Sequence, residues 1–278
     1  MNGVTIRKII TVHSLVSLII LGSCTQDSSS ALDILNKTIN SIDTIETIYY
    51  KQDMIRTNPR QLEETIFRYR EMCFQRLIQD SIVGVKGHWY FYGNDGSTVN
   101  YEDIFDGNRL IRKNNLDSAI RLYDLIKYPE FSKEHFWSHN TLYGLQYVFK
   151  YILDHTGSYQ LIRLNDTIFM DKNCFQIVIY LEDKMTMPGF ATQLEDSEGN
   201  ITKTLFIIDK QNYYPVRMKE ESYSNKNPGQ KYFIDQTYYD IKFNFEVEEH
   251  IIFNTSSDHF TGYVINEIVS ENTLNKNQ

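Results

Sequence analysis

The chain has 278 residues, of which 41% are hydrophobic and 23% charged, as in an ordinary globular protein. Its 20 Tyr, 16 Phe and 2 Trp favour strands over helices. The formal net charge of −8 gives no concentration of Lys and Arg for binding a phosphate backbone, so we expect no nucleic-acid partner.

The N-terminus has the three parts of a secretory signal. Arg7 and Lys8 precede a mainly apolar run over residues 9–21, which ends in small residues. A transmembrane helix needs about 20 apolar residues, and this run is shorter. Residues 21–24, Leu-Gly-Ser-Cys, resemble the lipobox of bacterial lipoproteins, in which the cysteine is acylated and the chain is cleaved just before it. Ordinary secretory cleavage, leaving a free Cys24, is the alternative.

This motif predicts where the mature protein is held. Residues 1–23 are expected to be a lipoprotein signal peptide, residues 24–30 a polar tether, and Cys24 the site of lipid attachment. Two or three acyl chains make such an anchor practically permanent. Thr25 directly after the cysteine is typical of lipoproteins sent to an outer membrane. We therefore expect a cell-envelope protein at the outer membrane, on its periplasmic face or its surface.

The first half of the mature chain predicts one helix and then strands. Residues 31–45 place apolar side chains three and four apart, as in an amphipathic helix. The pattern then changes to period two, which predicts strands; they cover residues 47–56, 65–78, 87–92, 99–105 and 109–112. Turn chemistry at residues 94–97 and 106–108 predicts tight turns, the second joining a hairpin.

The second half predicts two helices and a final block of strands. Helical spacing covers residues 116–126 and 140–153. The strands are expected at residues 158–164, 174–181, 203–209, 213–223, 231–244 and 248–254. Loops are expected at residues 187–189, 196–200 and 224–229. Strict alternation over residues 241–247 indicates a half-buried strand.

The order of these elements predicts a single α+β domain over residues 31–278. We expect an extended antiparallel β-sheet that covers a few helices. No internal repeat or interdomain linker interrupts the pattern.

Three pieces of the sequence carry a family resemblance. A helix runs straight into Tyr-Tyr-Lys at residues 49–51, a long series of strands follows, and Leu-Phe-Ile-Ile-Asp-Lys at 205–210 precedes Tyr-Tyr-Pro-Val-Arg at 213–217. Together they resemble the LolA-like superfamily, which includes LolA, LolB and LppX. The resemblance covers about residues 31–270. It implies that the extended antiparallel sheet is curved into an open half-barrel, covers a few helices on its concave face, and binds acyl chains of lipids or lipoproteins there. Similar domains occur in envelope proteins of Bacteroidota, and we expect such a source.

Catalytic and metal motifs are weak. His135 and His139 stand four apart, but a third ligand and the glutamate of the zinc-protease pattern are missing, so we expect no metal. The acid pairs at 63–64 and 248–249 are typical of a solvated face. No nucleophile elbow, Walker loop or dinucleotide fingerprint occurs, and we expect neither an enzyme nor a cofactor.

Cys73 and Cys174 lie in predicted strands. A disulfide between them is possible outside the cytoplasm, and two separately buried thiols are the alternative.

Aromatic and aliphatic side chains are the remaining functional signal. They share strand faces and are expected to line a cavity for acyl chains, although an ordinary filled core would show the same pattern. The residues are Trp89, Phe91, Phe175, Ile177, Ile179, Phe243 and Phe245.

Three functions remain open from the sequence. The first is a membrane-anchored, non-catalytic lipoprotein that binds or transfers lipid or acylated protein. The second is a tethered structural domain with a filled core that docks a protein partner through its sheet face or edge. The third is a hydrolase without a recognisable motif, which convergent polar residues with shifted pKa values would reveal.

Overall fold

The computed structural model describes residues 29–58, 61–77, 84–128, 141–154, 159–185, 195–248 and 253–268. Over this part of the chain the fold has two α-helices, α1 (Ala31–Asp43) and α3 (Thr141–Asp154), and one 12-stranded sheet. The strands are β1 (Thr47–Asn58), β2 (Gln61–Arg76), β3 (Val85–Tyr92), β4 (Val99–Phe105), β5 (Arg109–Asn114), β6 (Ala119–Asp124), β7 (Tyr159–Phe169), β8 (Lys172–Met185), β9 (Glu195–Asp209), β10 (Pro215–Ser224), β11 (Asn227–Phe243) and β12 (Val264–Ile268).

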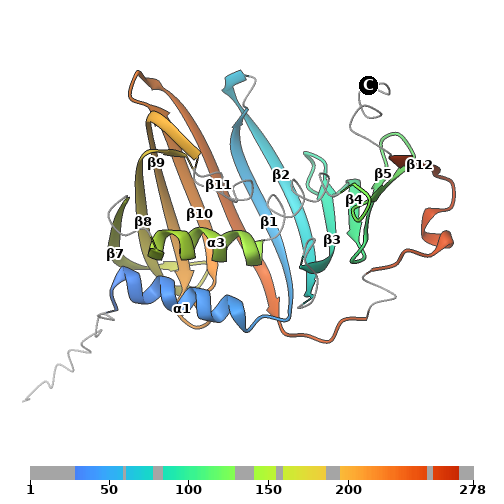
Figure 1. The fold of residues 1–278 in the computed structure, drawn as a ribbon, viewed down its shortest axis with the longest axis horizontal. Helices are drawn as coiled ribbons and strands as arrows, with labels where there is room; N and C mark the ends of the chain where they lie inside the picture. The colour runs from blue at the N-terminus through green and yellow to red at the C-terminus, as the bar shows by residue number, and fades with distance from the viewer. Residues whose placement is uncertain are drawn as a thin grey trace, which may run out of the picture.

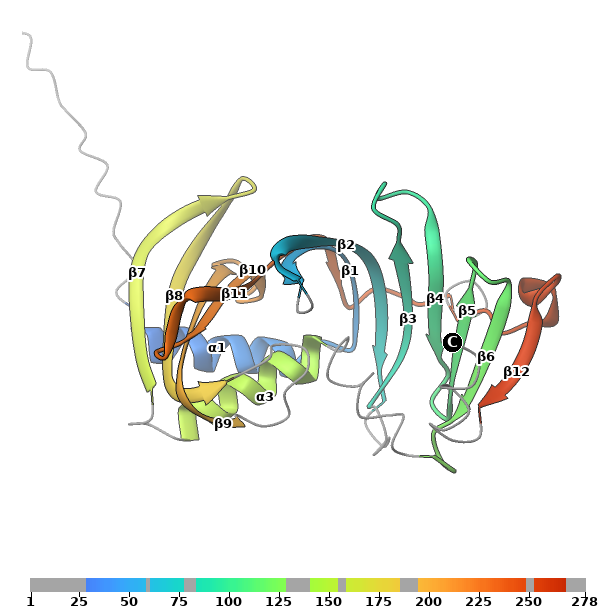
Figure 2. The same cartoon turned by 90° about the horizontal axis from the view of Figure 1, so that it is seen from above.

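The described sheet is open, because its two edge strands, β12 and β7, do not pair with each other. The strand order is β12-β6-β5-β4-β3-β2-β1-β11-β10-β9-β8-β7. The pairs from β6 through to β7 are antiparallel, whereas β12 is parallel to β6. Figures 1 and 2 show the sheet curving around α1 and α3, which lie across β7–β11 and β1 on one side. The predicted half-barrel with helices on its concave face is confirmed.

Helix α1 starts and ends where its local chemistry requires. Ser30 and Asp33 form a capping box at its first turn, which satisfies backbone N–H groups that have no partner inside the helix. At the other end, the guanidinium of Arg76 on β2 donates hydrogen bonds to the carbonyls of Ile42 and Asp43. The buried face of α1 includes Ile34, Leu35, Ile39 and Ile42. Helix and sheet are therefore joined both by apolar packing and by hydrogen bonds.

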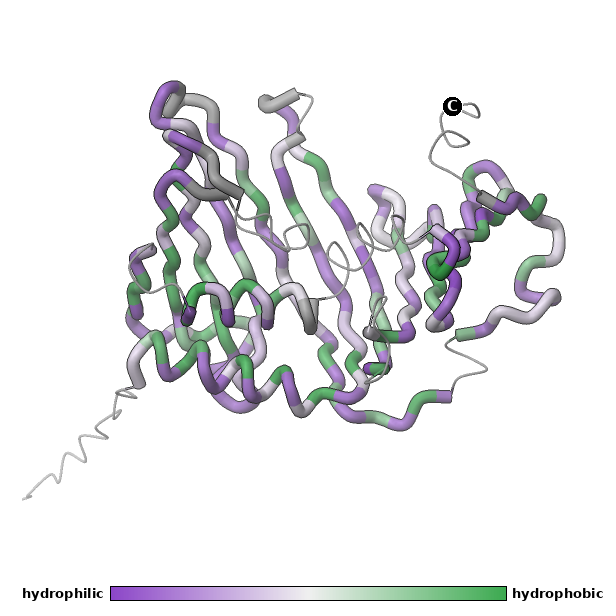
Figure 3. Tube along the Cα trace, viewed as in Figure 1, coloured by the Kyte–Doolittle hydropathy of each residue, from purple (hydrophilic) through white to green (hydrophobic). Residues whose placement is uncertain are grey.

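The main core lies between the helices and the concave face. It combines the buried face of α1, three residues of α3 and one face of most strands. Figure 3 shows hydrophilic and hydrophobic residues alternating along the strands, as expected when one face is buried. In the described part of the chain, no helix has the length and hydropathy needed to cross a membrane.

Both predicted turns of the first half are present. Asp95 and Asp106 each accept hydrogen bonds from backbone N–H groups two and three residues ahead. Gly107 has a φ of 108°, a conformation that strongly favours glycine. The hairpin of β4 and β5 is confirmed, with Phe105 paired to Leu110.

The helix predicted over residues 116–126 is wrong, since this segment forms a turn followed by β6. Ser118 has a φ of 51°, and Asp117 accepts a hydrogen bond from the Ala119 N–H, so the chain reverses and pairs with β5. Leu116 and Ile126, the ends of the expected helical stripe, are 74% and 63% exposed. The apolar spacing here reflects two faces of a strand and not one face of a helix.

Four further expectations in the second half need correction. Residues 196–200 belong to β9 and not to a loop, because β8 has an irregularity at Asp183 that lets pairing continue to Asp196. The loop at 224–229 shrinks to a tight turn at residues 225–226. Glu248, Phe253 and Asn254 are not in a strand, and residues 249–252 lie outside the described part. The strand predicted to Val247 ends at Phe243, although alternating burial continues to residue 248. The loop expected at 187–189 also lies outside the described residues.

The C-terminal segment packs on the opposite, convex face. Ile104, Ile111 and Ile120 form a small cluster there, against which Phe260 and Tyr263 pack. The short 3-10 helix η1 (Ser257–Phe260) precedes β12, and the Tyr263 hydroxyl donates a 2.6 Å hydrogen bond to Asn115.

Candidate functional site

The concave face brings together most of the residues that the sequence predicts for a cavity. Trp89 and Phe91 on β3, and Phe175, Ile177 and Ile179 on β8, are all buried in the main core. Phe243 is half-buried against this core, while Phe245 is half-buried just beyond β11. The first six of these side chains belong to one continuous apolar cluster or pack against it, and Phe245 lies outside that cluster. The cavity that they are expected to line stays a prediction.

Helix α3 covers part of this surface. Its Phe149 meets Phe206 of β9 edge to face, with ring centroids 4.9 Å apart. Phe206 pairs with Ile177 of β8 and so lies on the same face of the sheet. Leu145 and Ile152 of α3 belong to the same core. The apolar face of the helix therefore occupies sheet surface that an apolar ligand would also contact.

Trp89 depends on the absence of a side chain two residues before it. A Cβ atom on Gly87 would lie 2.5 Å from the Trp89 ring, far below contact distance. The indole therefore lies flat over the backbone of Gly87 and meets Phe74 edge to face at 5.2 Å. Phe91, next on this face, stacks on Tyr101 with centroids 4.2 Å apart.

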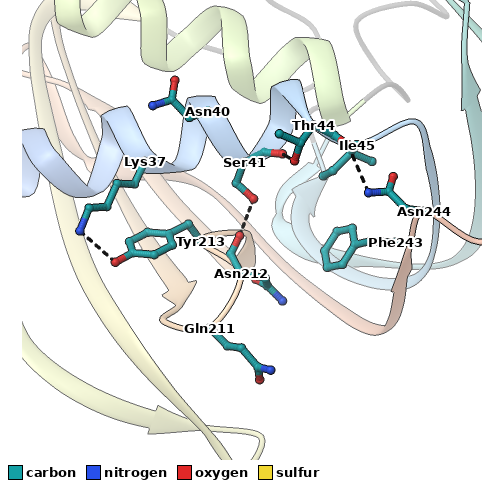
Figure 4. Close-up of a pocket in the computed structure, with 10 residues that line it drawn as sticks. All are labelled: Lys37, Asn40, Ser41, Thr44, Ile45, Gln211, Asn212, Tyr213, Phe243 and Asn244. Carbon is teal, nitrogen blue, oxygen red and sulfur yellow. Dashed lines mark hydrogen bonds between the residues drawn. The ribbon is translucent and has the colours of Figure 1, made fainter.

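A pocket of about 500 Å³ opens between α1, the β9–β10 turn and the end of β11 (Figure 4). Lys37 donates a 3.2 Å hydrogen bond to the Tyr213 hydroxyl, and Ser41 bonds the carbonyl of Asn212. Most of the lining residues are polar by type, although apolar atoms contribute the larger part of the lining surface, and Phe243 is the one lining residue among the predicted site residues; the lining is Lys37, Asn40, Ser41, Thr44, Ile45, Gln211, Asn212, Tyr213, Phe243 and Asn244. The volume and the mixed lining suit a small ligand with both polar and apolar parts.

The concave face also has a row of polar side chains that the sequence analysis missed. Gln52 of β1 donates a 2.6 Å hydrogen bond to Gln236 of β11, whose carbonyl oxygen also accepts one from Tyr238. Arg70 of β2 points its guanidinium at Gln52, with 3.5 Å between Nη1 and Oε1. Period-two alternation could have placed Arg70 on the face of Met72 and Phe74, but the neighbours on β1 and β11 depend on strand order.

A second polar cluster lies on the convex face. Glu102 of β4 is buried, with His88 and Lys113 each 3.1 Å away and His259 at 3.3 Å. Burial opposes ionisation of this carboxyl, but hydrogen bonds from His88 and Lys113 and their charges outweigh it and lower its pKa to about 2. The cluster holds the C-terminal segment against the sheet through His259.

The remaining chemical candidates gain no support as reactive groups. Cys73 and Cys174 are separate, buried thiols, and burial raises their pKa values to about 12 and about 11. Among the described residues, no three His, Cys, Asp or Glu side chains gather as metal ligands would. Glu64 and Glu248 are exposed. The side chain of Glu63, and Glu249, His135 and His139, lie outside the described part.

No protein-family model matches the sequence, and no curated protein matches it either. Solved structures of similar fold include the lipoprotein LppX from Mycobacterium tuberculosis, at 10% identity and a TM-score of 0.45, over 80% of this chain and 100% of that one. A MucA/MucB complex from Pseudomonas aeruginosa matches at 8% identity and a TM-score of 0.43, over 84% of this chain and 61% of that one. A LolA superfamily protein from Nitrosomonas europaea matches at 10% identity and a TM-score of 0.34, over 84% of this chain and 100% of that one. The family that the sequence resembles is thus among these structures, while a source in Bacteroidota stays a prediction.

Proposed function

We propose that this protein is a cell-envelope lipoprotein, anchored through Cys24, that binds or transfers lipid or acylated protein on its concave face without covalent chemistry. The observation that carries the proposal is the continuous apolar surface of an open sheet, covered in part by two helices. Residues 1–23 are its signal peptide and residues 24–30 its tether to the outer membrane.

The energetics suit exchange with a membrane. Each methylene gains about 0.8 kcal/mol on leaving water, but almost nothing on moving from a bilayer to an apolar protein surface. An acyl chain on the concave face would replace contacts that α3 makes through Phe149, Leu145 and Ile152. Binding then exchanges one set of apolar contacts for another. The free-energy change of moving an acyl chain between bilayer and protein should therefore be close to zero in both directions.

The decisive test is the lipid content of the purified protein. The mature chain with Cys24→Ala, which carries no acyl group of its own, is analysed by native mass spectrometry before and after solvent extraction. We expect added mass that extracts as phospholipid or fatty acid. A protein that carries no lipid and takes up none from vesicles contradicts the proposal.

A matched pair of variants shows where the lipid binds. Ile177→Phe adds volume on the concave face, whereas Ile207→Phe adds the same group to a neighbouring strand on the convex face. Both overpack a buried site and are expected to cost similar stability, about 1–3 kcal/mol. Only Ile177→Phe should lower the lipid occupancy; equal occupancy in both variants would place the lipid elsewhere.

The anchor is tested separately in cells. The full chain should incorporate a labelled fatty acid and fractionate with the outer membrane, and Cys24→Ser should abolish both. Labelling that persists in the variant contradicts acylation at Cys24.

A docking function is the second candidate, and the exposed edge strands favour it. Ile162 and Leu164 on β7 are each 39% exposed, and Val264 and Ile265 on β12 are 66% and 59% exposed. An unpaired edge with apolar side chains can receive a strand from another protein. Clean mass spectra together with a partner crosslinked to β7 or β12 would favour this function.

A further inference from the structure

Three arginines gather on the concave face near the outer end of the β1–β2 pair. Arg70 and Arg68 of β2 pair with Gln52 and Met54 of β1, so they lie on the face of the main core. Arg56 follows Met54 by two residues on β1 and shares that face. β1 runs away from α1 (Figure 1), which places Arg56 roughly 30 Å along the strand from Thr47 at the rise of an extended chain.

These arginines differ from three others on the same face, which form ion pairs. Arg112 is paired with Asp103 at 2.6 Å, and Arg121 and Arg163 form ion pairs with Asp117 and Asp166. In the described part of the chain, no carboxylate forms an ion pair with Arg56, Arg68 or Arg70. Among the described residues, the buried Nε atoms of Arg56 and Arg70 have no hydrogen-bond partner, as is also true of the Nε atom of Arg163.

Arg70 is held in place although its charge is poorly compensated. Its guanidinium lies 5.3 Å from the centre of the Phe91 ring, and Gln52, fixed by Gln236 and Tyr238, faces its Nη1. Burial, together with the charges of Arg68 and Arg56, lowers its pKa. In a chain whose net charge is −8, an oriented cluster of like charges beside an apolar surface is costly unless an anion neutralises it.

We infer that Arg56, Arg68 and Arg70 bind the phosphate group of an anionic lipid whose acyl chains lie on the adjoining apolar surface. Guanidinium groups match phosphate oxygens through paired N–H donors. Phe91 contacts the Arg70 guanidinium and belongs to the same apolar core as Trp89, so the cluster adjoins that core. This inference rests on the proposed function and adds the class of lipid to it.

The test compares lipids that share their acyl chains. The mature chain with Cys24→Ala is titrated with phosphatidylglycerol, with the matching diacylglycerol and with inorganic phosphate, and binding is measured by native mass spectrometry. We expect phosphatidylglycerol to bind at least tenfold more tightly than either of the others. Equal binding of the two lipids overturns the inference and leaves the proposed function standing.

Other outcomes separate the two proposals. If neither lipid binds, the proposed function fails together with the lipid assignment. If inorganic phosphate nevertheless binds, and substituting the arginines abolishes that binding, the cluster is a site for a free anion. Inorganic phosphate that binds as tightly as phosphatidylglycerol likewise overturns the lipid source.

Variants locate the effect. Arg68→Gln and Arg70→Gln should each weaken phosphatidylglycerol binding roughly tenfold and leave diacylglycerol binding unchanged. Arg70→Lys keeps the charge but loses the paired donors, so an intermediate loss is expected. Lys242→Gln, which removes one charge from an exposed site on the convex face, is the control. Because a poorly compensated charge is removed, the melting temperature of ligand-free Arg70→Gln should not fall; a large fall together with unchanged lipid preference would show a structural role instead.

Discussion

Gln52 and Gln236 lie 184 positions apart in the sequence and share a 2.6 Å hydrogen bond on the concave face. Both side chains are buried, and the bond connects β1 with β11 at the centre of the sheet. Polar groups of this kind are stable inside a core only when they are paired.

Removing this bond should destabilise the protein. Gln52→Ala takes a hydrogen bond from Gln236 and opens space in the core, so we expect a loss of about 1–3 kcal/mol in the free energy of unfolding. Urea denaturation measures it, with Gln160→Ala at an exposed position of β7 as the matched control. Equal midpoints for the two variants would contradict a structural role for the pair.

Gly87→Ala should disturb Trp89, because the new methyl group would occupy the place of the ring. We expect a loss of about 1–3 kcal/mol and a changed environment of the indole, read from tryptophan fluorescence. The double variant Gly87→Ala/Trp89→Leu removes the clashing ring. Its cost should therefore be less than the sum of the two single costs, and simple additivity would argue against the close approach.

Acid should weaken the fold through Glu102. Its pKa falls from 4.5 to about 2 in the folded protein, so the folded state binds this proton less readily than the unfolded chain does. The stabilisation is complete above about pH 4.5 and is lost progressively as the pH falls towards 2. Unfolding followed from pH 6 to 2 should show this decline, and Glu102→Gln should flatten it. The variant should also be less stable at pH 6, since Lys113 and His259 lose their carboxylate.

Cys73 and Cys174 should resist thiol reagents. With pKa values of about 12 and 11 they hold almost no thiolate at pH 7.5, and both are buried. The Cys24→Ala protein should therefore react with a maleimide only after unfolding, when two thiols become available. Rapid labelling of the folded protein would show that one of these sites opens readily.

Secondary structure was predictable where the apolar spacing fitted only a helix or only a strand. The prediction was wrong where the spacing fitted both. Helix α1 combines a capping box with regular apolar spacing, and its bounds agree closely with expectation. Residues 116–126 show apolar spacing that fits either structure, and the deciding factor is the reversal at Ser118. A positive φ at a serine leaves little trace in the sequence.

The candidate site was predictable only in its apolar part. Trp89 and Phe91 share a face by simple alternation, as do Phe175, Ile177 and Ile179. The arginine cluster needs the register of β1 against β2, which sets Arg70 opposite Gln52, and the order that sets β11 beside β1. The acidic net charge did not indicate this cluster, because a total charge says nothing of where three arginines without an ion pair to any described carboxylate lie.

The position of β1 has a consequence for how the chain would fold during the proposed export. In the described sheet, its pairing with β11 is the ladder that joins β1–β6 to β7–β11. β2 follows β1 at once, but β11 begins only at Asn227. A chain that crosses a membrane from its N-terminus therefore holds one edge of β1 open until almost all of the protein has passed. During that interval the open edge is available to other strands, so association before completion competes with correct folding.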